Sequence, residues 1–144
     1  MQVENILKTK GNRVVTATAE TTLRSAATVL KTERIGAVVV VDRDGGVVGI
    51  MSERDIAHAL AGDAQSVGDM TVGDVMTRAV LSCTRGDHID DVMRLMSTRR
   101  VRHLPVIEGG ALLGMISIGD IVKARLAELE SETETLREYI VSPR

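Results

Sequence analysis

Two copies of one short pattern contain the residues best suited to bind a ligand. Ser52 and Asp55 end an apolar run in the first copy, and Ser117 and Asp120 end a similar run 65 residues later. We expect each pair to lie where a strand passes into a helix. The free N–H groups and dipole at a helix N-terminus attract anions, and a nearby carboxylate can accept hydrogen bonds from a diol. The same spacing also forms a capping box that needs no ligand, so both interpretations stay open.

The likeness between the two halves extends over most of the chain. Residues 34–49 align with residues 100–114, and residues 22–30 align with residues 88–96. Each half contains an amphipathic segment, two apolar runs joined by a glycine-containing turn, and a second helical segment. A repeat of this length indicates units that stack to bury a continuous core. We therefore predict an α+β fold built from two tandem β-α-β-β-α repeats.

The repeat boundaries divide the chain into four parts. Residues 1–62 form the first repeat, residues 63–69 a polar linker, residues 70–125 the second repeat and residues 126–144 a C-terminal helical extension. Within the second repeat, Asp87 is the predicted N-cap of the first long helix.

The C-terminal extension has a heptad spacing with a polar residue at one position. The spaced residues are Leu126, Leu129, Thr133, Leu136 and Ile140. Only two heptads are present, fewer than the three or four that define a coiled coil firmly. Pairing with another subunit, docking onto the chain's own domain and a solvated tail are all compatible with this pattern.

The composition argues against several classes of function. The chain has a net charge of −2, one Tyr, no Phe and no Trp, which does not suit sequence-independent nucleic-acid binding. No apolar stretch approaches the roughly 18 residues of a membrane span. Cys83 is the only cysteine, which fits a cytoplasmic protein, and we expect it to be an inert thiol. The three histidines lack metal-binding spacing, so we expect neither catalysis nor a catalytic cofactor.

Taken together, the two Ser-x-x-Asp motifs and their paired hairpins resemble a tandem cystathionine-β-synthase (CBS) domain protein, here a stand-alone Bateman module, over residues 1–125. The resemblance implies that the two repeats pack sheet to sheet with pseudo-two-fold symmetry around a central cleft with two ligand sites. It also implies an adenine nucleotide ligand (AMP, ADP, ATP or NAD(H)), with or without Mg²⁺ on its phosphates. S-adenosylmethionine is a ligand of some members, and many members form homodimers.

The resemblance assigns residues to both sites. The site that uses the second motif takes Thr21, Ala26, Ile35, Gly36, Ala37, Arg102, His103, Ser117 and Asp120. The site that uses the first motif takes Ser52, Arg54, Asp55, Asp87, Val92 and Val101, together with the backbone of Arg102. Gly36 and Ala37 stand where the second repeat has Arg102 and His103, so we expect two unequal sites. Outside a ligand site, Arg54, Arg102 and His103 would be solvated residues at element ends.

Two functions follow as expectations. The first is a regulatory module that senses an adenine nucleotide and signals to an unidentified partner through rearrangement of a CBS dimer. The second is a constitutive homo-oligomeric scaffold whose clefts no longer bind ligand, with the C-terminal helix building a higher oligomer.

Overall fold

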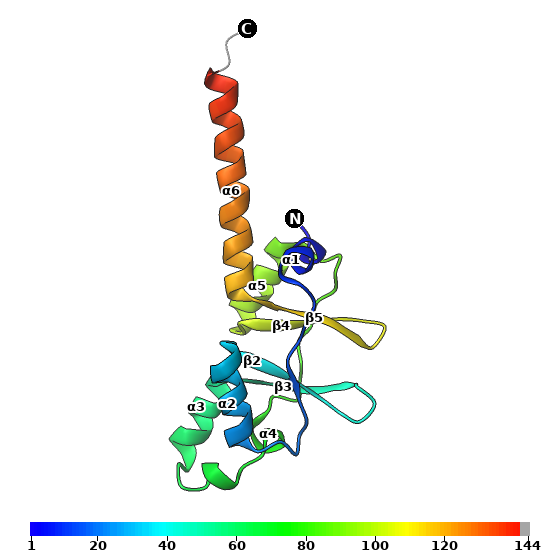
Figure 1. The fold of residues 1–144 in the computed structure, drawn as a ribbon, viewed down its shortest axis with the longest axis vertical. Coiled ribbons are helices and arrows are strands. Elements are labelled where there is room, and N and C mark those ends of the chain that lie inside the picture. Colours follow the sequence, from blue (N-terminus) through cyan, green and yellow to red (C-terminus); the bar gives the residue numbers. More distant parts are fainter. Residues whose placement is uncertain (142–144) are drawn as a thin grey trace.

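The computed structural model describes residues 1–141 and contains two α+β units and a projecting helix (Figure 1). The elements follow one another in the order α1 (Val3–Lys10), β1 (Thr16–Ala17), α2 (Leu23–Glu33), β2 (Ala37–Val41), β3 (Val47–Ser52), α3 (Glu53–Gly62), η1 (Val67–Asp69), α4 (Val72–Val75), α5 (Ile89–Arg99), β4 (His103–Glu108), β5 (Ala111–Ser117) and α6 (Ile118–Val141). The predicted α+β fold of two packed repeats with a C-terminal helix is confirmed.

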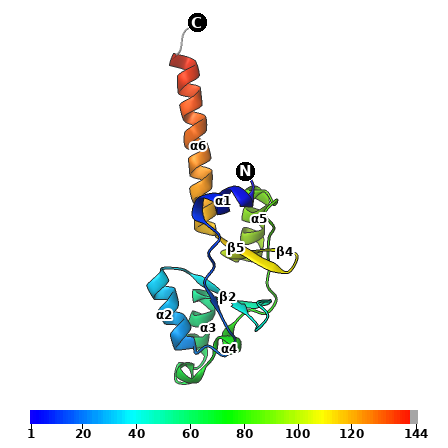
Figure 2. The same cartoon turned by 45° about the vertical axis from the view of Figure 1, so that its right-hand side comes forward.

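Each unit is built around an antiparallel hairpin. β2 pairs with β3, and β1 adds to β2 in parallel, whereas β4 pairs with β5 alone. In the second unit the place of β1 is reduced to a single parallel bridge between Cys83 and Val106. The turns contain Gly45, Gly109 and Gly110 at positive φ, which glycine adopts without a steric penalty. Figure 2 shows the two hairpins stacked with their turns pointing the same way.

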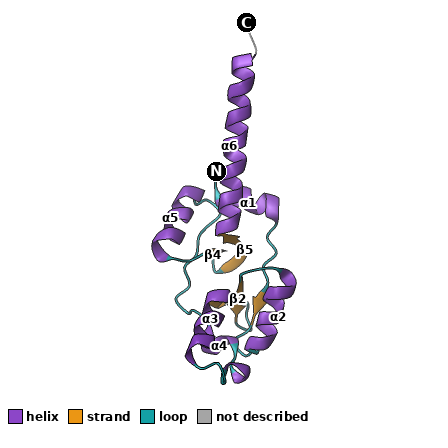
Figure 3. Ribbon diagram, turned by 90° about the vertical axis from the view of Figure 1, so that its left-hand side faces the viewer, coloured by secondary structure: helices purple, strands orange, loops and turns teal. Residues whose placement is uncertain are grey.

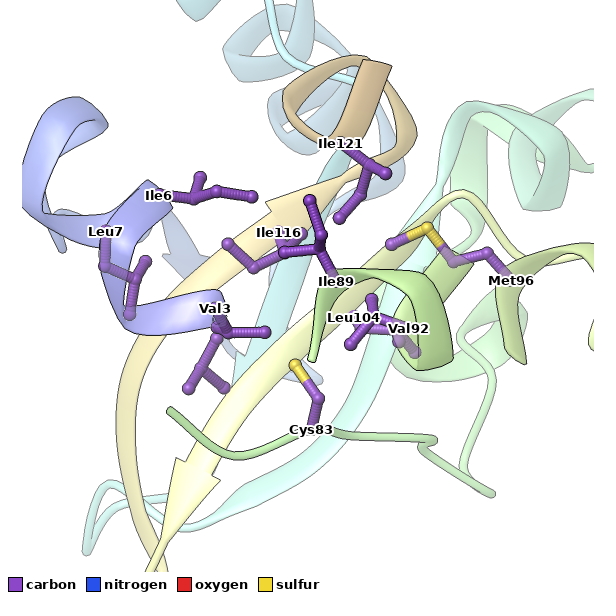
Figure 4. Close-up of a cluster of buried hydrophobic side chains, with 11 residues drawn as sticks. Val3, Ile6, Leu7, Cys83, Ile89, Val92, Met96, Leu104, Ile116 and Ile121 are labelled. Carbon is purple, nitrogen blue, oxygen red and sulfur yellow. The ribbon is translucent and has the colours of Figure 1, made fainter. Parts of the chain in front are cut away.

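The two units exchange their leading segments. α1 precedes the first unit in the chain, yet Val3, Ile6 and Leu7 belong to the hydrophobic core of the second unit (Figure 4). Reciprocally, Val72, the first residue of α4, and Met76, its C-cap, belong to the core of the first unit. Each repeat therefore completes the core of the other.

The repeated glycines Gly49 and Gly114 make this exchange possible. A Cβ on Gly49 would lie 2.6 Å from the Met76 sulfur, and a Cβ on Gly114 would lie 2.6 Å from Leu7 Cδ2. A Cβ at either position would force the side chain of the exchanged segment to shift, so glycine allows the segment to pack closely on the hairpin.

Helix α6 is continuous from the second Ser-x-x-Asp motif to Val141. Its first turns pack on the second unit through Ile121, which is buried, whereas residues 129–141 are exposed. Figure 3 shows the helix leaving the domain, so docking onto the chain's own domain is not what the structure shows. Residues 142–144 of the predicted extension lie outside the described residues.

The predicted N-cap at Asp87 is wrong by one position. His88 is the N-cap of α5, and its ring nitrogen accepts from the N–H of Asp90. Asp87 instead accepts from the N–H of Thr84 at 2.9 Å, because it closes the tight turn that precedes the helix. None of the helices in residues 1–141 has the length and apolar character needed to cross a membrane.

Candidate functional site

Two clefts lie where the repeats meet. Cleft 1 has a volume of about 260 Å³ and is lined by Gly36, Ile50, Ser52, Glu53, Arg54, Asp55, Thr77, Ala79, Leu81, Arg100, Val101, Arg102 and His103. Cleft 2 has a volume of about 550 Å³ and is lined by Leu30, Lys31, Arg34, Ile35, Gly36, Glu53, Arg102, His103, Ser117, Ile118 and Gly119. Ligand pockets commonly measure about 300–1,000 Å³.

The clefts are counterparts in the repeat alignment. Arg34, Ile35 and Gly36 in cleft 2 correspond to Arg100, Val101 and Arg102 in cleft 1, and the two Ser-x-x-Asp motifs also correspond. The N–H of Glu53 donates to the carbonyl of Gly36, and the N–H of Ile118 donates to the carbonyl of Arg102, each at 2.9 Å. These matching hydrogen bonds give the two clefts the same backbone frame. The pseudo-symmetry of the fold therefore extends to its clefts.

The clefts also share a wall. Gly36, Glu53, Arg102 and His103 line both of them. The His103 ring lies against Gly36, where a Cβ would lie 2.9 Å from its Cε1 and Nε2 atoms. Burial lowers the pKa of His103, with Glu53 and Asp120 acting in the opposite direction. The shared wall thus contains an imidazole that is held largely neutral near pH 7.

In both motifs the aspartate folds back onto the serine. The N–H of Ser52 donates to Asp55 Oδ2 at 2.8 Å, and the N–H of Ser117 donates to Asp120 Oδ2 at 2.9 Å. The N–H of Asp120 donates in turn to Ser117 Oγ at 3.2 Å. These are capping boxes, so the structural interpretation of the motif holds. Both serines nevertheless line a cleft at a helix N-terminus, and a capping role does not prevent contact with a ligand.

Asp120 is already paired with a cation. Lys10 Nζ donates to Asp120 Oδ2 at 2.7 Å and to the carbonyl of Met115 at 2.9 Å. Burial of Asp120 opposes ionisation, but the hydrogen bonds from Lys10 and Ser117 outweigh it and leave the pKa below its ordinary value. Lys10 comes from α1, one of the exchanged leading segments.

Asp55 has a different neighbour in cleft 1. Its Oδ1 accepts a long hydrogen bond of 3.4 Å from the Thr77 hydroxyl. Among residues 1–141, no lysine forms an ion pair with Asp55. Arg54, which the resemblance assigns to this site, donates from Nη1 to the carbonyl of Arg100 at 2.7 Å.

The family can be decided from the chain itself. The family model of the CBS domain matches residues 3–62 and again residues 72–127. The chain belongs to the CBS domain family. The predicted tandem CBS organisation is therefore confirmed.

Several known proteins resemble this CBS protein. The mitochondrial CBS domain-containing protein CBSX3 of Arabidopsis thaliana is 31% identical over 96% of this chain and 71% of its own. The crystal structure of ATU1752 from Agrobacterium tumefaciens has a TM-score of 0.85 at 43% identity, covering 87% of this chain and 99% of that one.

Two further structures are similar at lower identity. The CBS domain pair of protein MJ0100, in complex with 5'-methylthioadenosine and S-adenosyl-L-methionine, has a TM-score of 0.79 at 27% identity, covering 89% of this chain and 98% of that one. A hexameric CBS-CP12 protein from bloom-forming cyanobacteria has a TM-score of 0.77 at 29% identity, covering 96% of this chain and 83% of that one.

The structure brings together most of the predicted site residues at the junction of the CBS repeats. Ile35, Gly36, Arg102, His103 and Ser117 line cleft 2, with Asp120 bonded to Ser117. The predicted residues that line cleft 1 are Ser52, Arg54, Asp55, Val101 and Arg102.

Six predicted site residues are not among those that line either cleft, and one of them is Asp120, which lies behind Ser117 as its capping partner. Ala26 and Val92 are buried in the two cores, and Ala37 is a buried residue of β2. Thr21 and Asp87 anchor the exchanged segments: their carbonyls accept from the N–H of Val72 at 2.8 Å and of Val3 at 2.9 Å. Thr21 and Asp87 therefore bind the exchanged segment of the other unit rather than line a cleft.

Other cleft residues were absent from the prediction. They are Leu30, Lys31, Arg34, Ile50, Glu53, Thr77, Ala79, Leu81, Arg100, Ile118 and Gly119. The sequence did contain a signal for Arg34 and Arg100, because they occupy equivalent positions in the two repeats. In the structure both residues adopt left-handed backbone conformations at φ 55°.

The structure also bears on nucleophilic attack by Cys83 and on metal binding. Burial, with a contribution from Asp87, raises the pKa of the Cys83 thiol to about 12, so the thiolate needed for nucleophilic attack is scarce near pH 7. Within residues 1–141 there is also no group of three or more His, Cys, Asp or Glu side chains placed to hold a metal ion.

Proposed function

We propose that this CBS protein binds an adenosine-containing ligand in its two clefts and acts as a regulatory module. The ligand class is an adenine nucleotide (AMP, ADP, ATP or NAD(H)), with Mg²⁺ carried on the phosphates where several are present. The observation that carries this proposal is the repetition, in both clefts, of a Ser-Asp helix N-terminus beside a basic rim.

The basic rim suits phosphate. Cleft 2 is lined by Lys31, Arg34 and Arg102 against the single carboxylate of Glu53. Ser117 adds a hydroxyl at the N-terminus of α6, where the helix dipole favours negative charge. Arginine side chains bind phosphate with two parallel N–H donors.

Cleft 1 suits a nucleoside. Ile50, Leu81 and Val101 give an apolar wall on which a base can pack. The Asp55 carboxylate lies in the same cleft with no lysine paired to it among residues 1–141, so it can accept from a ribose diol.

The backbone of Arg34 and Arg100 supports a role for their side chains. Both residues cap a helix in the left-handed conformation, where glycine is the usual residue. A non-glycine residue there costs on the order of 1–2 kcal/mol. Each arginine lines one cleft, so a contact between the guanidinium group and an anion would offset this cost.

The similar structures support the ligand class. The CBS domain pair of MJ0100 was crystallised with 5'-methylthioadenosine and S-adenosyl-L-methionine, which share an adenosine core. That core is the part common to AMP, ATP and NAD(H). The phosphate-binding groups of this chain favour a phosphorylated member of the class.

The continuity of α6 supports a proposed route from the clefts to a partner. α6 begins at Ile118, directly after the cleft residue Ser117, and runs without interruption to Val141. A ligand that prefers one arrangement of the two repeats shifts the population toward it, and a continuous helix carries the change outward.

The scaffold alternative rests on a different observation. Leu126, Leu129, Leu136 and Ile140 of α6 are all more than half exposed. An apolar surface of this kind can serve assembly without any ligand. The hexameric CBS-CP12 protein shows that a similar CBS protein assembles.

A thermal-shift panel separates the two functions. AMP, ADP, ATP, NAD⁺, NADH and S-adenosylmethionine are each titrated, with and without Mg²⁺, against protein stripped of nucleotide. A ligand that binds the folded state stabilises it by about 2.7 kcal/mol at a hundredfold excess over Kd. We expect a dose-dependent rise in Tm with at least one phosphorylated ligand. No rise with any of the six would contradict the proposed function and favour the scaffold.

A further inference from the structure

The outer part of α6 lacks the packing that a helix normally needs. Leu126 is 55% exposed, Leu136 62% and Ile140 78%. The outer part runs from Leu126 to Val141, barely longer than the roughly 12–15 residues below which isolated helices are marginal in water. It also contains Ser131, a weak helix former. A partner that covers the apolar side chains would supply the missing stabilisation.

The exposed apolar side chains form one stripe. We name it the α6 seam; it consists of Val122, Leu126, Leu129, Thr133, Leu136 and Ile140, at alternating steps of four and three residues. These are the a and d positions of a heptad pattern, with Leu126 at a and Leu129 at d. Ile121, which packs into the second core, lies about a quarter turn away at 100° per residue. The seam is therefore separate from the face that packs on the domain.

Charged residues on both sides of the seam select the direction of a partner helix. Arg125 and Glu132 occupy g positions, and Glu130 and Arg137 occupy e positions. In a parallel, in-register pair, each g residue faces the e residue five positions later on the other helix. Arg125 would then face Glu130 of the second copy, and Glu132 would face Arg137 of the second copy. Symmetry doubles each attraction.

The antiparallel alternative places like charges together. In the antiparallel register that overlaps all six seam positions, e faces e and g faces g. Glu130 would face Glu130 of the second copy, and Glu132 would face Glu132. Lys123 would face Arg137. Three kinds of repulsive pair replace two kinds of attractive pair.

From this pattern we propose that α6 pairs with α6 of a second copy of this chain as a parallel, in-register, two-stranded coiled coil. The occupant of the α6 seam is thus a second copy, selected by charge complementarity along both flanks. This pairing does not depend on ligand binding in the clefts, and it places both domains of a dimer at the same end of the coiled coil.

The charge pair of Glu132 with Arg137 of the second copy contributes most to the preference for the parallel orientation. Arg125 already contacts Glu128 at 2.9 Å and Asp90 at 3.6 Å within its own chain, so its pairing across the seam competes with these contacts. Glu132 and Arg137 have no ion pair within residues 1–141 and are free to pair between copies. Position 137 is therefore the most informative place for a charge reversal.

Disulfide trapping in the full-length protein tests the direction. In a parallel pair, Leu126→Cys forms a disulfide with the same position of the second copy, and Leu136→Cys does likewise. In the antiparallel register, a mixture of the two variants forms only the 126–136 disulfide. The wild-type chain is the control, since its single Cys83 is buried. We expect the same-position dimers on non-reducing gels.

Charge reversal tests whether the flanking charges select the parallel orientation. We expect Arg137→Glu to weaken the α6 pairing by about tenfold, because each pair changes by a few tenths of a kcal/mol and two pairs turn from attraction to repulsion. The double variant Glu132→Arg/Arg137→Glu should restore it. Ser131→Glu, on the outer face of the helix, is the control and should have little effect. The readout is the rate of disulfide trapping at position 126.

The outcomes are decisive in either direction. Same-position disulfides with the expected charge response support the proposal. Formation of the 126–136 disulfide, or tighter pairing of Arg137→Glu, would overturn the parallel orientation. Absence of any disulfide at concentrations where the protein is dimeric by sedimentation equilibrium would overturn pairing through α6.

Discussion

Cleft 1 and cleft 2 share a backbone frame and one wall, yet they differ in their charged side chains. Arg54 of cleft 1 corresponds to Gly119 of cleft 2, and Glu53 corresponds to Ile118. Lys10 pairs with Asp120 at 2.7 Å, whereas Asp55 has no ion pair among residues 1–141. Cleft 1 thus has three basic and two acidic lining residues, whereas cleft 2 has three basic and one acidic.

The two repeats retain the same backbone contacts, while the side chains that line their clefts differ. The backbone contacts of Glu53 with Gly36 and of Ile118 with Arg102 are retained in both halves because they hold the frame. The side chains that meet a ligand are free to diverge. We expect cleft 1 to favour the nucleoside, through Asp55 and its apolar wall, and cleft 2 to favour phosphate.

The largest expected effect is that of Asp55→Ala. Hydrogen bonds to charged groups contribute about 1.5–3 kcal/mol, so we expect the tighter binding of an adenine nucleotide to weaken by about 10- to 100-fold. The measurement is Kd by titration calorimetry. Loss of the capping box should also lower the free energy of unfolding by about 1 kcal/mol.

Asp120→Ala is the matched control for this effect, because it removes the corresponding capping box. Lys10 already occupies the carboxylate of Asp120, so we expect less than about a threefold change in the same Kd. Equal losses from the two variants would show that the clefts use their aspartates alike.

A smaller effect is expected from Lys10→Met. This variant releases Asp120 to accept from a ribose, so we expect adenosine to bind cleft 2 about three- to tenfold more tightly. The same variant removes a positive charge and should weaken the binding of ATP. The Lys10–Asp120 pair is partly exposed, so the loss of stability should stay below about 1 kcal/mol. Lys8→Met, at an exposed position of α1, is the control, and matching behaviour of both variants would contradict the role of Lys10.

The smallest expected effect concerns His103 and pH. Burial lowers its pKa below 6.5, so the unfolded state binds more protons as the pH falls from 6.5 through the folded-state pKa. The stability contributed by neutral His103 is therefore present above pH 6.5 and is lost below it. A phosphate in either cleft favours the protonated ring and opposes this loss.

We accordingly expect the affinity for AMP to rise about two- to threefold, relative to adenosine, between pH 7.5 and 5.5. His103→Gln should remove this rise. An unchanged pH dependence in that variant would assign the effect to another group.

The fold was predictable from the repeat, but the exchange of leading segments was not. Val3 and Val72 are apolar and match each other in the alignment, and they would be buried whichever unit they joined. The exchange is visible only in three-dimensional contacts, such as those of Gly49 with Met76 and of Gly114 with Leu7.

The residues of the site were predictable where local sequence spacing identifies them. Ser52, Asp55, Ser117 and Asp120 stand out because a strand that becomes a helix is visible in the sequence. His103 was assigned to one site, but the structure places it on the wall between two, since the hairpins stack.

Long-range ion pairs were not visible in the sequence. The pair between Lys10 and Asp120 joins residues at opposite ends of the repeat pattern, and no local spacing predicts it. The contact of Arg54 with the carbonyl of Arg100 is also long-range, because it depends on how the second unit ends its α5 helix.

Titration calorimetry of the full-length protein, with the nucleotide that most raises its Tm, measures directly whether both clefts bind ligand. We expect two binding events per chain with different affinities, of which Asp55→Ala weakens the tighter. A titration without binding heat at several temperatures, or binding that neither Asp55→Ala nor Asp120→Ala alters, would contradict the assignment of the clefts.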